Sequence, residues 1–77
     1  MAFFFFHWDD EIMEHLAQHG VTQDEFAEVV QNPDESGTSR STGRATATGV
    51  TSTGKTLFCV YEMIDAETVL PVTAYEV

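Results

Sequence analysis

The sequence predicts a small α+β domain: a short N-terminal strand, a two-helix hairpin and a three-stranded antiparallel meander. Three observations support this fold class. Apolar residues recur at helical spacing in two short segments between residues 10 and 31. Residues 56–64 are almost continuously apolar, as in a buried strand. The chain has 77 residues, so we expect a single domain over residues 1–77.

The first elements are an aromatic strand and a capped helix. Residues Phe3–Trp8 are aromatic and end before a helix-cap signal, which predicts a short strand. Asp9 is a suitable N-cap for a first helix over Asp10–His19, and Gly20 can take the left-handed conformation that ends it. Two alternatives stay open for Phe3–Phe6: burial under the helices, or an exposed patch that dimerises or takes a partner strand.

The second helix is the best specified element. It is predicted over Gln23–Gln31, because Thr22 and Glu25 have the spacing of a capping box and Pro33 disfavours helical geometry at the residue before it. Two apolar residues occupy the positions of a hydrophobic staple: Val21 and Phe26. Only three residues join the two helices, which predicts a tight helical hairpin.

Three strands are predicted after the helices. Residues 34–44 read as a loop or a ragged edge strand, and Ala45–Thr51 as a strand that ends in a turn at residues 52–54. Thr56–Ile64 is apolar on both faces, so it is predicted to be the central strand. After a turn at residues 65–67, Thr68–Tyr75 forms the last strand, in which Pro71 marks either a sheet edge or a bulge.

The cysteine content and the apolar segments of the chain indicate where in the cell the protein is expected. Cys59 is the only cysteine and lies in an apolar run, so we expect a buried side chain and no internal disulfide. The apolar start is not predicted to be a signal peptide, because no basic residue precedes it and acidic residues follow at once. No segment approaches the roughly 20 apolar residues of a membrane span. We therefore expect a cytoplasmic protein.

Charge is distributed unevenly along the chain, whose formal net charge is −10. Residues 1–39 carry nine acidic residues and no Lys or Arg. The three basic residues follow in the hydroxyl-rich middle: Arg40, Arg44 and Lys55. Extended nucleic-acid binding needs many cations, so this class of function is disfavoured. An acidic face suits a basic protein partner, or serves only solubility.

Several short motifs follow one another in a recognisable order. They are Trp8-Asp9, His19-Gly20-Val21, Glu25-Phe26, Arg44 before Gly49, Gly54-Lys55, and Val72-Thr73-Ala74. In order and spacing the chain resembles the BrnT-like toxin family, within the RelE/ParE-like toxins, and its uncharacterised relatives. The resemblance implies a cytoplasmic ribonuclease toxin that uses no cofactor and no metal and is neutralised by a small DNA-binding antitoxin. Tyr75 stands where that family commonly has arginine, which implies weakened or altered activity.

Candidate catalytic residues follow from what RNA cleavage requires, namely cations beside the phosphate and a group that moves protons. Arg44 matches the family position for a phosphate contact, and Arg40 and Lys55 are further candidates for binding RNA phosphate by charge alone. His19 is a candidate base or acid, or else a residue that complements the helix dipole. Tyr75 is a candidate proton donor or base-stacking residue, or else a cross-strand packing residue.

Two further hypotheses complete the sequence-based account. Glu11, His15 and His19 share one helix face, a spacing at which two histidines can bind zinc, although a solvated face is favoured.

A non-catalytic module that binds a basic protein through its acidic helices is the alternative to the toxin. RNA and a second copy of the chain are the other candidate partners.

Overall fold

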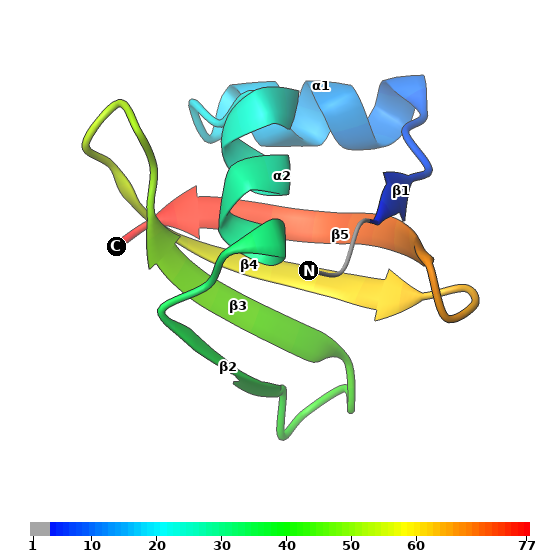
Figure 1. The fold of residues 1–77 in the computed structure, drawn as a ribbon. Helices are drawn as coiled ribbons and strands as arrows, with labels where there is room; N and C mark the ends of the chain where they lie inside the picture. The colour runs from blue at the N-terminus through cyan, green and yellow to red at the C-terminus, as the bar shows by residue number, and fades with distance from the viewer. Residues whose placement is uncertain (1–3) are drawn as a thin grey trace.

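The computed structural model describes residues 4–77, which form two helices on one face of a five-stranded mixed sheet (Figure 1). The elements follow one another as β1 (Phe5–Phe6), α1 (Asp10–Gln18), α2 (Gln23–Gln31), β2 (Glu35–Thr38), β3 (Ala45–Val50), β4 (Thr56–Met63) and β5 (Thr68–Glu76). The strand order across the sheet is β1-β5-β4-β3-β2. The α+β class is confirmed, and the strands that follow the helices number four rather than three because the residues after Pro33 add β2.

Helix α1 begins and ends where local sequence signals place it. The Asp9 carboxylate accepts a hydrogen bond from the Ile12 backbone N–H at 2.8 Å, as an N-cap does. At the other end Gly20 has a φ of 73°, and the Val21 N–H reaches back to the Leu16 carbonyl at 3.0 Å. This pattern is a Schellman cap, which only glycine adopts without strain.

Helix α2 has the predicted capping box, in which Thr22 and Glu25 each bond the backbone of the other at 3.1 and 3.0 Å. Val21 and Phe26 are both buried in the core, as a hydrophobic staple requires. The helices are consecutive, but Figure 1 shows them at a wide angle rather than side by side. Helix α1 packs mainly on β5 and α2 on β3 and β4, because their apolar stripes face the sheet.

Strand β4 is central in the sheet, as predicted, and it pairs antiparallel with β3 and β5. Leu57 and Cys59 are 0% exposed on the face covered by the helices, which confirms that Cys59 is a buried apolar side chain. The two alternatives for Pro71 resolve as a bulge: the β4–β5 register shifts at Val60/Tyr61, and Pro71 faces Tyr61 beside that shift. Strand β5 lies inside the sheet, between β4 and β1.

The N-terminal strand is shorter than predicted. Only Phe5–Phe6 pair, in parallel with Thr68 and Val69 of β5, and Phe3 lies outside the described residues. Phe6 packs into the core, with its ring 6.2 Å from that of Phe26, whereas Phe5 is 61% exposed. Burial under the helices is therefore realised for Phe6 and not for Phe5, because neighbouring side chains of a strand point to opposite faces. The alternative of an interface at this segment stays a prediction.

Within residues 4–77, neither helix has the length and apolar character that a membrane crossing requires.

Candidate functional site

The candidate site is a hollow of about 450 Å³ between the first turns of α1, strand β5 and the start of β3. Its polar lining residues are Asp9, Glu11, His15, Arg44 and Glu62. Apolar side chains of α1 and β5 complete the wall. It combines a histidine with a basic residue, which three other hollows of the described residues do not. We therefore name it the Arg44 hollow.

Arg44 comes to this hollow through the register of the sheet. Ala45 faces Tyr61 in the antiparallel pairing of β3 with β4. Arg44, one residue before Ala45, therefore lies opposite Glu62, one residue after Tyr61. The Arg44 Nε donates to the Glu62 Oε1 at 2.9 Å, and the two side chains are 39% and 46% exposed. An ion pair this exposed is screened by water, so either partner can be exchanged for a ligand at low cost.

His15 supplies the imidazole of the Arg44 hollow. It lies on α1, where its Nε2 is 2.9 Å from the Thr73 Oγ1 of β5. This contact fixes one ring nitrogen against the sheet. The ring of His19, one turn further along, contacts the His15 ring at a centroid distance of 5.0 Å in an edge-to-face arrangement. His19 itself lies at the C-cap of α1 and does not line the hollow.

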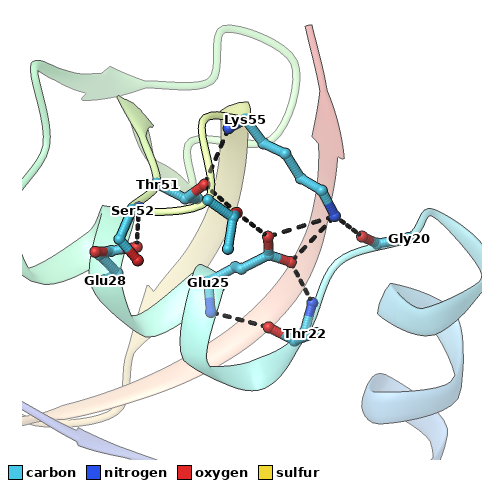
Figure 2. A network of polar contacts seen from close by, with 8 residues as sticks. Gly20, Thr22, Glu25, Glu28, Thr51, Ser52 and Lys55 are labelled. Carbon is cyan, nitrogen blue, oxygen red and sulfur yellow. Dashed lines mark hydrogen bonds and ion pairs between the residues drawn. The ribbon is translucent and has the colours of Figure 1, made fainter.

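Lys55 belongs to a different part of the molecule, a polar cluster that we call the Glu25 clamp (Figure 2). In it the Glu25 carboxylate accepts from the Thr53 hydroxyl at 2.7 Å and from the Lys55 Nζ at 3.3 Å. Lys55 also donates to the Gly20 carbonyl at 2.8 Å. The clamp therefore joins the cap of α1, the start of α2 and the β3–β4 turn.

A second carboxylate extends the clamp. Glu28 of α2 accepts the Ser52 backbone N–H at 2.8 Å, so two successive turns of α2 hold the β3–β4 turn (Figure 2). Glu25 is buried, yet hydrogen bonds from Thr53 and from the Thr22 backbone lower its pKa below the ordinary value of 4.5. Lys55 lowers the pKa further, and burial opposes these effects without outweighing them. Lys55 thus has a structural role here.

The remaining candidates lie in two other places. Arg40 is exposed beyond the end of β2 and lines a separate hollow of about 410 Å³ with hydroxyl side chains of β2 and β3. Tyr75 is on β5, where its ring packs against Phe58 with centroids 5.4 Å apart, the cross-strand packing alternative. The structure therefore does not bring His19, Arg44 and Tyr75 into one hollow, nor does it bring Arg40, Arg44 and Lys55 together.

Sequence reasoning missed that His15 and Arg44 line the same hollow. The available signal was the helical repeat of Glu11, His15 and His19, which places His15 on a particular face of α1 but does not say what that face meets. Residues 4–77 contain no group of three or more His, Cys, Asp or Glu side chains arranged to hold a metal ion. The hollow can bind an anion at Arg44 and move a proton at His15.

Comparison of this chain with protein-family models, with curated proteins and with solved structures found no match.

Proposed function

We propose that this protein is a BrnT-like member of a toxin–antitoxin system that acts in the cytoplasm and retains weakened ribonuclease chemistry. The supporting observation is that Arg44, which matches the family position for a phosphate contact, lines the same hollow as His15. The element order of strand, two helices and antiparallel strands also agrees with a RelE/ParE-like fold. In this proposal His15 takes the histidine role that the sequence suggested for His19.

The chemistry divides between two side chains. RNA cleavage begins when a base removes the proton of a 2′-hydroxyl, whose oxygen then attacks the adjacent phosphorus. The attack displaces the 5′-oxygen of the next nucleotide, which takes a proton from water. Neutral His15 accepts that proton through a ring nitrogen, and Arg44 stabilises the charge that develops on the phosphate. No metal or cofactor takes part.

Weakened activity follows from the acidic lining. Arg44 must exchange the Glu62 carboxylate for a phosphate, and the acidic side chains of Asp9 and Glu11 line the same hollow. Like charges repel the RNA backbone at this short range. The hollow thus disfavours binding of its own substrate more than a basic site does, which gives low affinity without loss of the two reacting groups.

A growth assay on induced expression tests the proposal. The wild-type chain is expected to arrest growth, and Arg44→Ala is expected to abolish the arrest while the protein stays folded. Glu62→Ala is the matched variant, because it breaks the same ion pair but leaves Arg44 free. It is expected to strengthen the arrest. Absence of arrest by the wild type at high expression, or equal arrest by wild type and Arg44→Ala, would count against the ribonuclease.

The second candidate is a non-catalytic acidic module that binds a small basic or DNA-binding antitoxin-like protein. A specific observation favours it: two of the three basic side chains are already paired, Arg44 with Glu62 and Lys55 with Glu25. The helical layer carries only acidic charge, because α1 and α2 contain neither Lys nor Arg. A basic partner is attracted to that layer.

This alternative has its own test with the product of the neighbouring reading frame. Reversing two exposed acids of α1, Asp10→Lys with Glu14→Lys, is expected to weaken binding about tenfold at low salt. Glu67→Lys, in the exposed turn before β5, reverses one acid outside the helical layer and is expected to change affinity much less. Equal effects at both places would contradict a helical docking face. Binding without growth arrest would favour the module over the ribonuclease.

A further inference from the structure

Strand β2 forms an outer edge of the sheet and pairs, within residues 4–77, with β3 alone (Figure 1). Its register is fixed by the pairing of Gly37 with Thr46, and the hairpin closes with a bond from the Ser39 N–H to the Arg44 carbonyl at 2.7 Å. In an antiparallel sheet, every second residue of a strand bonds a given neighbouring strand through its backbone N–H and C=O groups. The N–H and C=O groups of Ser36 and Thr38 therefore point outward, away from β3.

The two ends of this edge carry opposite and unpaired charge. Asp34 and Glu35 lie at its start, and Arg40 lies just beyond its end. All three side chains are exposed, and none forms a hydrogen bond or an ion pair with any residue in the described range 4–77. Arg40 is thus the one basic side chain of that range without an acidic partner, beside a row of free backbone groups.

We propose that β2 pairs antiparallel with β2 of a second copy of this chain, across a two-fold axis at Gly37. The two sheets then form one continuous sheet with the helices of both copies on the same face. This interface is separate from the Arg44 hollow, so it stands whether or not the protein is a ribonuclease.

In three registers, the residues whose backbone groups point outward face one another across the interface. The two-fold axis then lies at Ser36, Gly37 or Thr38. The register centred on Gly37 sets Ser36 of each copy against Thr38 of the other and satisfies the outward groups of both. Continued beyond the ends of β2, it brings the Asp34 end of one copy to the Arg40 end of the other, and does so twice by symmetry. Opposite charges facing each other across strands stabilise the pairing.

Glycine suits the axis position. In this register the two Gly37 residues form a pair without mutual hydrogen bonds, in which Cα atoms approach to about 4.5 Å. Side chains at such a pair stand off the sheet, so this separation accepts glycine and small side chains alike. The interface consists of one short strand per copy, and each chain carries a net charge of −10, so we expect weak association that strengthens with protein concentration.

The register is tested by a disulfide trap under diamide, which takes two electrons and two protons from a pair of thiols. Gly37→Cys is expected to give a cross-linked dimer, because the Cα separation at the axis permits a disulfide. A Cβ at this position meets only Thr46 Oγ1, at 3.6 Å, so the variant keeps its fold. Native Cys59 is fully buried, and burial raises its pKa to about 12, so it does not compete.

Glu35→Cys is the matched control. In the proposed register the two copies of residue 35 lie four positions apart along the strands, about 13 Å, which exceeds the reach of a disulfide. It is therefore expected to form no cross-link under the same oxidant. Equal cross-linking of both variants, or none by Gly37→Cys at high protein concentration, would overturn the proposed register.

A charge exchange tests the occupant of the edge by sedimentation equilibrium. Asp34→Arg and Arg40→Asp each place like charges across the interface, so each variant alone is expected to dimerise about tenfold more weakly than wild type. Mixing the two variants restores opposite charges at both places, and the mixture is expected to recover the wild-type average mass. A mixture that associates no better than its components, or a wild-type chain that stays monomeric at all concentrations, would overturn the pairing.

Discussion

Two ion pairs lie at opposite ends of the β3–β4 hairpin. Both join a basic side chain to a glutamate, but they differ in length, in burial and in the number of further hydrogen bonds. Arg44 and Glu62 meet at 2.9 Å with both side chains more than a third exposed. Lys55 and Glu25 meet at a longer 3.3 Å, but the Glu25 side chain is only 8% exposed. Distance alone would rank the first pair as stronger, whereas burial and the number of further hydrogen bonds rank the second as the one on which the fold depends.

The difference shows how one residue type takes two roles in a small domain. At the Glu25 clamp the carboxylate accepts from Thr22, Thr53 and Lys55, so its charge is compensated by three residues from two segments of the chain. At the Arg44 hollow one hydrogen bond joins two solvated side chains. A group with many fixed partners stabilises a fold, and a group with one exposed partner remains free to bind something else.

The largest expected effect comes from removing the clamp. Glu25→Ala removes the carboxylate half of the capping box and the partner of Thr53 and Lys55, so we expect a loss of about 2 kcal/mol in the free energy of unfolding. Urea denaturation followed by circular dichroism measures it. Glu28→Ala, which removes only the bond to Ser52, is expected to cost less, about 1 kcal/mol. Equal losses would show that the carboxylate at residue 25 has no special role.

The dependence of stability on pH tests the same comparison, because Glu25 loses its charge in acid. The pKa of Glu25 is lowered in the folded state, chiefly by the Thr53 hydrogen bond, so the unfolded chain binds more protons below the ordinary value of 4.5. The stabilisation is therefore complete above that pH and is lost as pH falls through the lowered value. We expect Glu25→Gln to reduce the slope of stability against pH below 4.5. Thermal unfolding at successive pH values measures this slope.

The reduction is expected to be partial. Hydrogen bonds from the Glu67 backbone and from Thr68 also lower the pKa of Asp65, in the exposed turn between β4 and β5. That group contributes acid sensitivity of its own. An unchanged slope in Glu25→Gln would contradict the assignment of a compensated carboxylate to the clamp.

Gly20 contributes a backbone carbonyl to the clamp, and substitutions there test its role. Its φ of 73° is unfavourable for residues with a side chain, and its carbonyl receives Lys55. Gly20→Ala is expected to lower the free energy of unfolding by about 1 kcal/mol. Asn tolerates this conformation better, so Gly20→Asn is expected to lose less. The order Gly, Asn, Ala in melting temperature checks the cap, and any other order would contradict it.

The smallest expected effect is at the other end of the hairpin. Glu62→Ala and Arg44→Ala are each expected to change the free energy of unfolding by less than about 0.5 kcal/mol, because both side chains are solvated. The same urea titration measures them. A loss as large as that of Glu25→Ala would mean that the Arg44 hollow is a structural site and not one available to a ligand.

Local signals predicted much of the fold. The caps at Asp9 and Gly20 and the capping box of Thr22 with Glu25 act over three or four residues, so the sequence alone contains them. The continuous apolar run likewise identified β4 as central. The hydroxyl-rich residues of β2 left two alternatives open, because an exposed edge strand has no apolar pattern to mark it.

The site was less predictable, because it depends on contacts between distant segments. The pairing of Arg44 with Glu62 requires the β3–β4 register, and the contact of His15 with Thr73 spans 58 positions of the chain. Lys55 was a candidate for binding RNA phosphate by charge alone, and only the tertiary structure shows that it reaches Gly20 and Glu25. A net count of basic residues could not show which of them were already paired.

A pair of double-mutant cycles tests the central comparison most directly. Single and double alanine variants of Glu25 with Lys55, and of Arg44 with Glu62, give two coupling energies from urea denaturation. The structure predicts a coupling of about 1 to 2 kcal/mol for the buried pair and less than about 0.5 kcal/mol for the exposed pair. Equal couplings, or a larger one between Arg44 and Glu62, would contradict the division between a structural clamp and a free site.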